Sequence, residues 1–178
     1  MGKNDINTSS LIRIFFKGHK RLLPTYLWVL WSVITILMFI GNLYKFIDLS
    51  AFSISSYLSV CIAGLSFTFA LFNISKSSFN NDELKKIAEY EGKLPSGRNI
   101  EKGTLLAEYL SPFLLTVFVL VVAATTALIV PFISLKIDYS ISNYLKISYL
   151  CLLLLGIFSL FNLTCMAVED LYNSIRRP

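Results

Sequence analysis

The sequence predicts an all-α polytopic membrane protein whose four transmembrane helices form two antiparallel hairpins, with the N- and C-termini in the cytoplasm. The chain of 178 residues is 55% hydrophobic and 15% charged, whereas soluble domains carry about 25% charged residues. Four segments, 24–44, 52–74, 110–135 and 144–168, have almost no charge. Each is long enough to cross a hydrocarbon core about 30 Å thick, and a segment in lipid must be helical to satisfy its own backbone hydrogen bonds.

The distribution of positive charge predicts the orientation. All but three of the 16 Lys and Arg residues lie before residue 24, between the second and third spans, or at the C-terminus; the exceptions are Lys45, Lys136 and Lys146. Because Lys and Arg are retained on the cytoplasmic side, we expect a multi-pass inner (plasma) membrane protein in contact with the lipid bilayer. The formal net charge of +5 then reflects topology, and no direct nucleic-acid partner is expected.

Residues 1–23 are predicted to form a basic amphipathic segment at the membrane interface. Between residues 10 and 23, basic side chains follow one helical face and apolar side chains largely the other, a pattern typical of helices that lie on anionic lipid. A helix that binds a protein partner is the alternative. Pro24 separates this segment from the first span. The predicted membrane-surface anchor consists of Arg13, Lys17, Lys20 and Arg21.

Short outer connections define the two hairpins. Residues 45–51 and 136–143 leave too little chain for a domain on the outer side, and short connections make successive helices antiparallel neighbours. The first transmembrane hairpin is therefore predicted at 24–74 and the second at 110–168.

Residues 75–109 are the largest predicted cytoplasmic piece. A short helix is expected from about residue 80 until Gly92, followed by a turn, and the chain then leads helically into the third span. That span is expected to begin at Ser111 and Pro112, because proline suits a first helical turn. Together with the cytoplasmic tail 169–178, this loop is expected to contact a cytoplasmic protein partner through Lys85, Lys86, Arg98, Lys102, Arg176 and Arg177.

Small and hydroxyl-bearing side chains recur in the second, third and fourth spans. In lipid, helices associate through close packing of such residues and through interhelical hydrogen bonds. Asn162 is the most polar side chain deep in a span, and its amide requires a partner on another helix. The residues predicted to pack helices, and to extend that packing into a homo-oligomer, are Gly64, Thr68, Ala123, Ala127, Gly156, Ser159 and Asn162.

The third span carries a block of small residues, 123–127, shortly before Pro131. Pro131 cannot donate a hydrogen bond to the carbonyl of Ala127, so a kink is expected there. The block is interpreted first as a packing seam beside that kink. In a second interpretation Thr125 or Thr126 faces the axis of an oligomer and lines a narrow polar path. In a third, the block faces lipid without a special role.

The deep portions of the spans contain no Asp, Glu, His, Lys or Arg. Transporters and proton relays keep such costly groups for ions and substrates, and an intramembrane enzyme needs an acid–base or nucleophilic constellation. Four charged residues lie close enough to span ends for their charged groups to reach water: Glu108, Lys146, Glu169 and Asp170. We therefore expect no enzyme, and no catalytic, cofactor-binding or metal-binding residues.

Two functional hypotheses remain. In the first, the chain is a non-enzymatic membrane subunit that oligomerises and recruits or signals to a cytoplasmic partner through residues 75–104, the basic N-terminal segment and the tail. In the second, it is a small channel or pore-forming effector that perturbs membrane permeability. Such a pore would need a hydroxyl-lined or hydrophobic gate, because the spans offer no ring of charges for ion selectivity.

The predicted architecture resembles a family of bacterial proteins. Four spans, cytoplasmic termini, very short outer loops and a basic central loop are similar to the small membrane subunits of anti-phage defence systems, such as the KwaA component of the Kiwa system. The resemblance covers the whole chain as a topology and rests on no sequence motif. It implies an oligomeric inner-membrane sensor, or scaffold, that passes a signal to a soluble nucleic-acid-binding partner.

Overall fold

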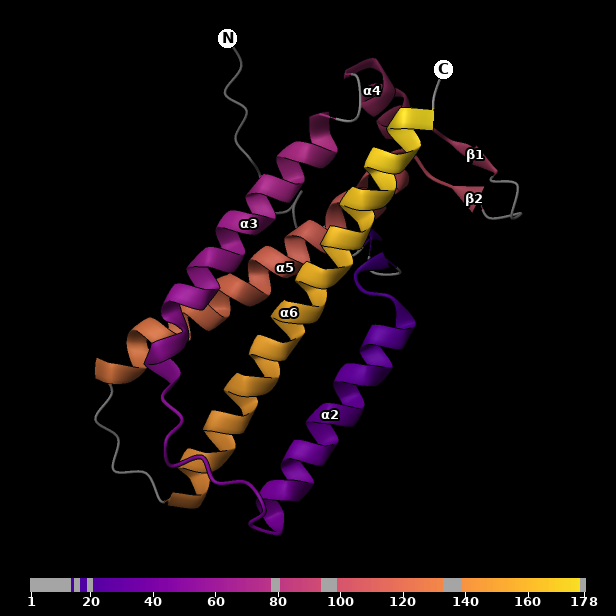
Figure 1. Ribbon diagram of the computed structural model, residues 1–178. Helices are drawn as coiled ribbons and strands as arrows, with labels where there is room; N and C mark the ends of the chain where they lie inside the picture. Colours follow the sequence, from indigo (N-terminus) through magenta and orange to yellow (C-terminus); the bar gives the residue numbers. More distant parts are fainter. Residues whose placement is uncertain are drawn as a thin grey trace.

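The computed structural model describes residues 14, 17, 18, 21–77, 81–93, 99–132 and 139–176. In chain order the elements are α2 (Thr25–Leu43), η2 (Ile54–Tyr57), α3 (Leu58–Ser77), α4 (Asn81–Glu89), β1 (Gly92–Lys93), β2 (Asn99–Ile100), α5 (Thr104–Ile129), η3 (Val130–Phe132) and α6 (Tyr139–Arg176) (Figure 1). Four helical segments are long and apolar enough to cross a membrane. The predicted all-α fold class with four membrane-spanning helices is thereby confirmed.

The four long helices alternate in direction, and α6 is the central one (Figure 1). It packs against α5, α3 and α2, while α3 also packs against α5. The first two spans follow each other as an antiparallel pair, as predicted, but α2 packs mainly on α6 and not on α3. The physical reason is that α3 turns its buried small residues toward α5 and α6, and these allow closer approach than the bulky side chains of α2.

The helix α6 is longer than the predicted fourth span. Its 38 residues correspond to about 57 Å at 1.5 Å per residue, whereas a hydrocarbon core is about 30 Å thick. No proline or glycine interrupts the stretch after Gly156, so the helix continues as far as Arg176. The predicted tail beginning at residue 169 is therefore mostly the end of α6 and not a separate segment.

Pro112 and Pro131 occupy different positions in the structure from those predicted. The helix α5 begins at Thr104, after Gly103 in a left-handed conformation, so Pro112 lies inside the helix and not in its first turn. At the other end, the α-helix stops at Ile129 and one 3₁₀ turn contains Pro131. Because Pro131 has no amide hydrogen to donate, the helical hydrogen bonding ends there; the predicted kink within a continuing helix is replaced by a helix end.

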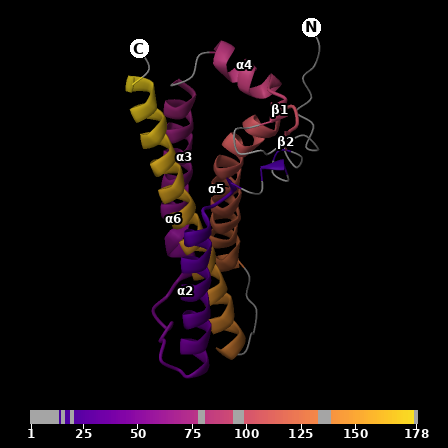
Figure 2. The same cartoon turned by 90° about the vertical axis from the view of Figure 1, so that its right-hand side faces the viewer.

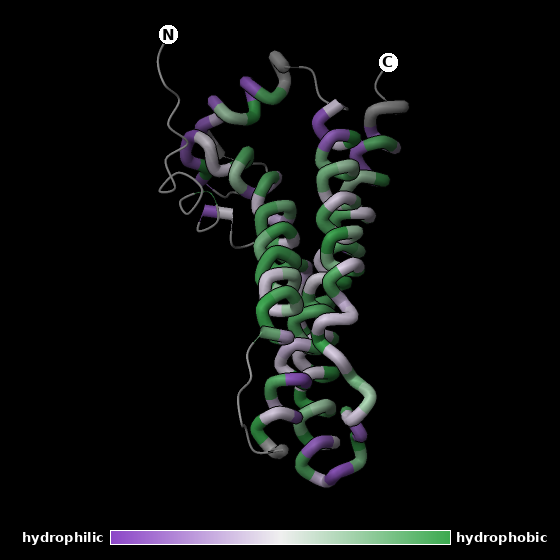
Figure 3. Tube along the Cα trace, turned by 90° about the vertical axis from the view of Figure 1, so that its left-hand side faces the viewer, coloured by the Kyte–Doolittle hydropathy of each residue, from purple (hydrophilic) through white to green (hydrophobic). Residues whose placement is uncertain are grey.

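One end of the bundle carries a small polar structure, which we call the α4 end. It consists of residues 21–24, α4, the strands β1 and β2, the start of α5 and the end of α6 (Figure 2). The strands form a two-residue antiparallel ladder in which Gly92 pairs with Ile100. Hydrophilic residues gather at this end and at the opposite one, and hydrophobic residues occupy the helices between them (Figure 3).

Candidate functional site

A cavity of about 500 Å³ lies at the α4 end, between residues 21–24, α4, α5 and α6. Its walls combine apolar side chains with amides and charged groups. The lining residues are Arg21, Leu23, Pro24, Leu84, Ile87, Leu105, Leu106, Glu108, Tyr109, Asn162, Met166, Glu169, Asp170 and Asn173. We call it the α4-end cavity.

The helix α6 contributes one continuous face to the cavity. Asn162, Met166, Glu169 and Asn173 are spaced by four, three and four residues, which places them on the same side of an α-helix. The distance along the helix from Asn162 to Asn173 is about 16 Å at 1.5 Å per residue. The cavity therefore extends from the polar end of α6 well into its apolar part.

Asn162 forms the deep end of this face and is only 6% exposed. Its amide nitrogen lies 3.9 Å from the sulfur of Met166, which is a weak acceptor. Within the described part of the chain, its carbonyl oxygen accepts no hydrogen bond. The interhelical partner that the sequence predicted for this amide is thus missing from the described residues, and the side chain borders the cavity instead.

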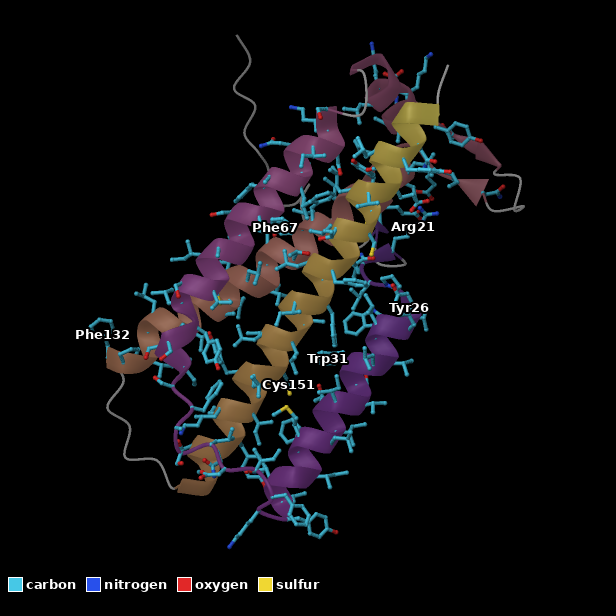
Figure 4. All side chains as sticks on the ribbon, in the orientation of Figure 1. Arg21, Tyr26, Trp31, Phe67, Phe132 and Cys151 are labelled. Atoms are coloured by element: carbon cyan, nitrogen blue, oxygen red, sulfur yellow. The ribbon has the colours of Figure 1, made fainter. Side chains whose placement is uncertain are left out.

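An ion pair closes another wall of the cavity. The Nε atom of Arg21 lies 3.6 Å from Oε2 of Glu108, and the two side chains are 72% and 3% exposed. Figure 4 shows Arg21 at the α4 end, beside the upper part of α6. A buried carboxylate is stable only when it is paired or hydrogen-bonded. Glu108 was expected to reach water at the end of its span; it is instead buried beside the guanidinium group.

A third polar contact joins α5 to α6 at the same place. The hydroxyl group of Tyr109 donates a hydrogen bond to Oδ2 of Asp170 at 3.3 Å. Tyr109 also packs against Phe113, with ring centroids 6.1 Å apart. These contacts hold the carboxylate of Asp170 and the aromatic ring at the cavity wall.

The described members of the predicted membrane-surface anchor make contacts within the chain. Nζ of Lys17 lies 3.0 Å from Oε2 of Glu101, and Arg21 pairs with Glu108 as described above. Each residue therefore ties the N-terminal segment to the region where α5 begins. The other two predicted anchor residues, Arg13 and Lys20, lie outside the described residues.

The residues predicted to contact a cytoplasmic partner lie at the α4 end. Lys85 and Lys86 are exposed on α4, and Lys102 is exposed just before α5. None of these three forms an ion pair with another described residue. Arg176 is the last residue of α6, with a side chain outside the description, and Arg98 and Arg177 lie outside the described residues.

The residues predicted to pack helices are all buried inside this one chain. A Cβ atom at Gly64 would lie 3.1 Å from Cδ1 of Leu120, and one at Gly156 would lie 3.1 Å from Cδ2 of the same leucine. Thr68 donates a hydrogen bond to the carbonyl of Gly64 at 2.8 Å. Their burial therefore requires no second subunit.

The same holds for the predicted packing residues of α5 and the middle of α6. Ala123 and Ala127 belong to a buried cluster with Cys61 and Tyr149. The hydroxyl of Ser159 is hydrogen-bonded to that of Thr116 on α5. An interhelical hydrogen bond was expected in the spans, and this pair supplies one between α5 and α6.

The two threonines considered as pore-lining residues lie on the outer part of the subunit. Thr125 is exposed. The hydroxyl of Thr126 donates to the carbonyl of Val122 in its own helix at 2.8 Å. Thr126 also borders a second cavity, of about 730 Å³, at the opposite end of the bundle, together with Lys146 and Tyr149.

Five polar residues of the α4-end cavity were not selected from the sequence as site residues: Glu108, Tyr109, Glu169, Asp170 and Asn173. The spacing of Asn162, Met166, Glu169 and Asn173 is a signal that could have indicated a shared helical face. No sequence signal places that face opposite Arg21 and Glu108, because the relation depends on how α6 packs against α5.

The fold and this site define the class of protein: a multi-pass membrane protein with four spanning helices and a polar structure with a cavity at one end. Among the described residues, no group of three or more His, Cys, Asp or Glu side chains is placed to hold a metal ion. Comparison with protein-family models, with curated proteins and with solved structures finds no match to the chain.

Proposed function

We propose that the chain is a non-enzymatic subunit of a bacterial inner membrane that forms a homo-oligomer and recruits or signals to a cytoplasmic protein through its α4 end. The observation that supports this proposal is the difference between the two ends of the bundle. The α4 end carries a folded structure, in which α4 packs on α5 and Lys17 pairs with Glu101. The opposite end consists of connections between spans.

The charge of the α4 end supports a cytoplasmic orientation. Among the described residues, all Lys and Arg except Lys45 and Lys146 lie at or near this end, and positive charge favours retention on the cytoplasmic side. The same exposed lysines, Lys85, Lys86 and Lys102, offer a positive surface to a partner with an acidic patch. Complementary charges of this kind increase the rate and specificity of association.

The role of a sensor or scaffold in phage defence is part of this proposal. It rests on the architectural resemblance to small membrane subunits of such systems, in which a membrane component signals to a soluble partner. The cavity and the exposed lysines both lie at the α4 end. A signal received at the cavity would therefore arise close to the surface that contacts the partner.

The first experiment is purification of the tagged protein from its native cell in mild detergent, followed by mass determination of the intact particle. We expect a defined homo-oligomer that carries a soluble protein in stoichiometric amount. The variant Lys85→Glu/Lys86→Glu should retain at least about tenfold less of that protein, because both charges that attract the acidic partner are reversed.

Lys45→Glu is the control, because Lys45 is exposed at the opposite end of the bundle. It should retain the partner at the wild-type level. A fluorescent protein that matures only in the cytoplasm, fused after residue 178, reports the orientation in the same cells and should fluoresce. A bare oligomer from wild-type cells, or full partner retention by the double variant, would contradict the recruitment proposal.

A channel or pore is the alternative function. The observation that favours it is the second cavity, where Thr126 and Lys146 bring polar groups to the end of the spans. The exposed position of Thr125 leaves its hydroxyl free to face a neighbouring subunit in an oligomer. This alternative requires conduction by the protein alone, without a soluble partner.

A further inference from the structure

The α4-end cavity contains more negative than positive side chains. Three carboxylates, those of Glu108, Glu169 and Asp170, face one guanidinium group, that of Arg21. Glu108 is paired with Arg21, and Asp170 accepts the hydroxyl of Tyr109. Glu169 is exposed and forms no hydrogen bond or ion pair with another described residue. The cavity therefore offers the negatively charged carboxylate of Glu169 to a cationic ligand.

Asn162 provides a second and independent indication of a ligand. It is a buried amide at the deep end of the cavity, and its only described side-chain contact is the weak one to the sulfur of Met166. A buried polar group without a strong hydrogen-bond partner is unfavourable for the fold. A ligand that forms a hydrogen bond with the amide of Asn162 would remove this cost.

The remaining walls are apolar and restrict the shape of the ligand. The apolar lining includes Leu23, Pro24, Leu105, Leu106 and Met166. The lining face of α6 runs about 16 Å along the helix, from the polar end into the apolar window of the span. A ligand that fills this space carries a polar cationic part next to an apolar part, which is the composition of a lipid at the bilayer surface.

We propose that the α4-end cavity binds a primary ammonium group, carried by a phosphatidylethanolamine headgroup. The ammonium group has three hydrogen-bond donors and no acceptor, which suits the carboxylate of Glu169 at the polar end of the cavity. Asn162 lies seven residues deeper, about 10 Å along α6, where its amide can donate to an ester carbonyl of the same lipid. Arg21 is largely exposed at the rim and uses only its Nε atom toward Glu108. Its remaining N–H groups are free to bind the phosphate, since a guanidinium group has five donors.

The same geometry discriminates against a choline headgroup. A quaternary ammonium group has no N–H donor, and proteins recognise it with several aromatic faces. Tyr109 is the one aromatic residue that lines the cavity in the described part of the chain. The lipid site does not depend on the recruitment proposal, because headgroup binding is the same whether or not a soluble protein docks on α4.

The test uses the full-length protein in detergent and native mass spectrometry with added lipids of identical acyl chains. Wild-type protein should bind phosphatidylethanolamine about tenfold more tightly than phosphatidylcholine. Glu169→Gln and Asn162→Leu should each reduce phosphatidylethanolamine binding about tenfold, the effect of losing one charged or buried hydrogen bond. Binding of phosphatidylcholine should stay unchanged in Glu169→Gln.

Two matched controls separate the cavity from its surroundings. Glu89→Gln removes an exposed carboxylate at the end of α4, and Asn73→Leu removes an exposed amide on α3; both should bind as the wild type does. The thermal unfolding midpoint, followed by the fluorescence of Trp28 and Trp31, shows whether each variant is folded. Glu169→Gln should unfold at the wild-type temperature because Glu169 is exposed.

Added soluble ethanolamine distinguishes the source of the ammonium group. Displacement of the lipid by millimolar ethanolamine, and not by inorganic phosphate, would support recognition of the ammonium group itself, from a lipid or a free amine. Retention of the lipid against ethanolamine, together with discrimination against choline, would support a lipid held by headgroup and acyl chain. Equal binding of the two lipids, or wild-type affinity in folded Glu169→Gln, would overturn the proposal.

Discussion

Gly64 and Gly156 lie on α3 and α6 where both helices approach the same leucine of α5. A Cβ atom at either position would lie 3.1 Å from a methyl group of Leu120. Close approach of this kind is what small residues provide in lipid, where dispersion contacts replace the hydrophobic effect as the force between helices. The contact of the three helices therefore depends on the absence of side chains at two residues.

The substitution Gly64→Leu tests this dependence. The added side chain has no space beside Leu120, so α3 must move away from α5, and we expect a loss of about 1–3 kcal/mol in the free energy of unfolding. Reversible unfolding in mixed detergent–SDS micelles measures it. Ala63→Leu is the control, because the neighbouring Ala63 is exposed and should tolerate leucine. Equal stability of the two variants would show that α3 does not pack closely at Gly64.

Among the long helices, α2 is the least buried. Only 6% of its apolar window is buried in the structure, against 28–39% for the other three spans. Its attachment to α6 includes a hydrogen bond from Nε1 of Trp31 to the carbonyl of Cys151 at 2.9 Å, and Figure 4 shows Trp31 directed toward Cys151. Leu49, Ile147 and Cys151 form a buried cluster near the same contact.

The substitution Trp31→Phe should weaken the attachment of α2. Phenylalanine keeps most of the apolar contact and loses the N–H donor, so we expect a loss of about 1 kcal/mol in the free energy of unfolding. The same SDS unfolding assay measures the change. Trp28→Phe is the control, since no hydrogen bond of Trp28's indole nitrogen appears within the described residues. A loss of the same size in both variants would assign the effect to ring size.

The element boundaries also show where local sequence signals were sufficient. The short helix expected near residue 80 is α4, which begins at Asn81. The sequence signal was the pair Asn80–Asn81, a residue type favoured at helix N-caps. The start of α5 differs from the prediction because Gly103 ends the preceding turn earlier than Pro112 would. A proline is favoured in the first turn of a helix. Pro112 nevertheless lies inside α5, where packing against other helices supports the helix on both sides of it.

For the whole molecule, the recruitment and pore proposals differ in what the purified protein does to a membrane. We expect liposomes containing the wild-type protein to release ions no faster than protein-free liposomes. Thr125→Leu/Thr126→Leu should then change neither flux nor partner capture, since Thr125 is exposed and Thr126 bonds within its own helix. Ion flux from dye-loaded liposomes measures the first, and retained partner the second.

Val121→Leu/Val122→Leu is the control for this pair, because both valines are exposed one turn earlier on α5. Conduction by wild-type protein that the threonine variant abolishes and the valine variant preserves would establish the pore alternative. The intact mass of the particle then gives the number of subunits around the conducting path.

The sequence by itself determined the class of protein and the positions of its four spans. In a bilayer every backbone polar group must be satisfied within the segment, so length and apolar composition are enough to specify a helix. The small and hydroxyl-bearing residues predicted to pack helices are buried in the structure, where they pack inside one chain. These properties depend on local composition and on the solvent around each segment.

Only the tertiary structure decided which helices are neighbours and where a site exists. The placement of α2 on α6, the burial of Glu108 beside Arg21 and the cavity bordered by Asn162 all join residues far apart in the chain. Such relations follow from the fit of side chains between helices, which the order of residues along one helix does not specify. The spans were therefore predictable from sequence, whereas the cavity was not.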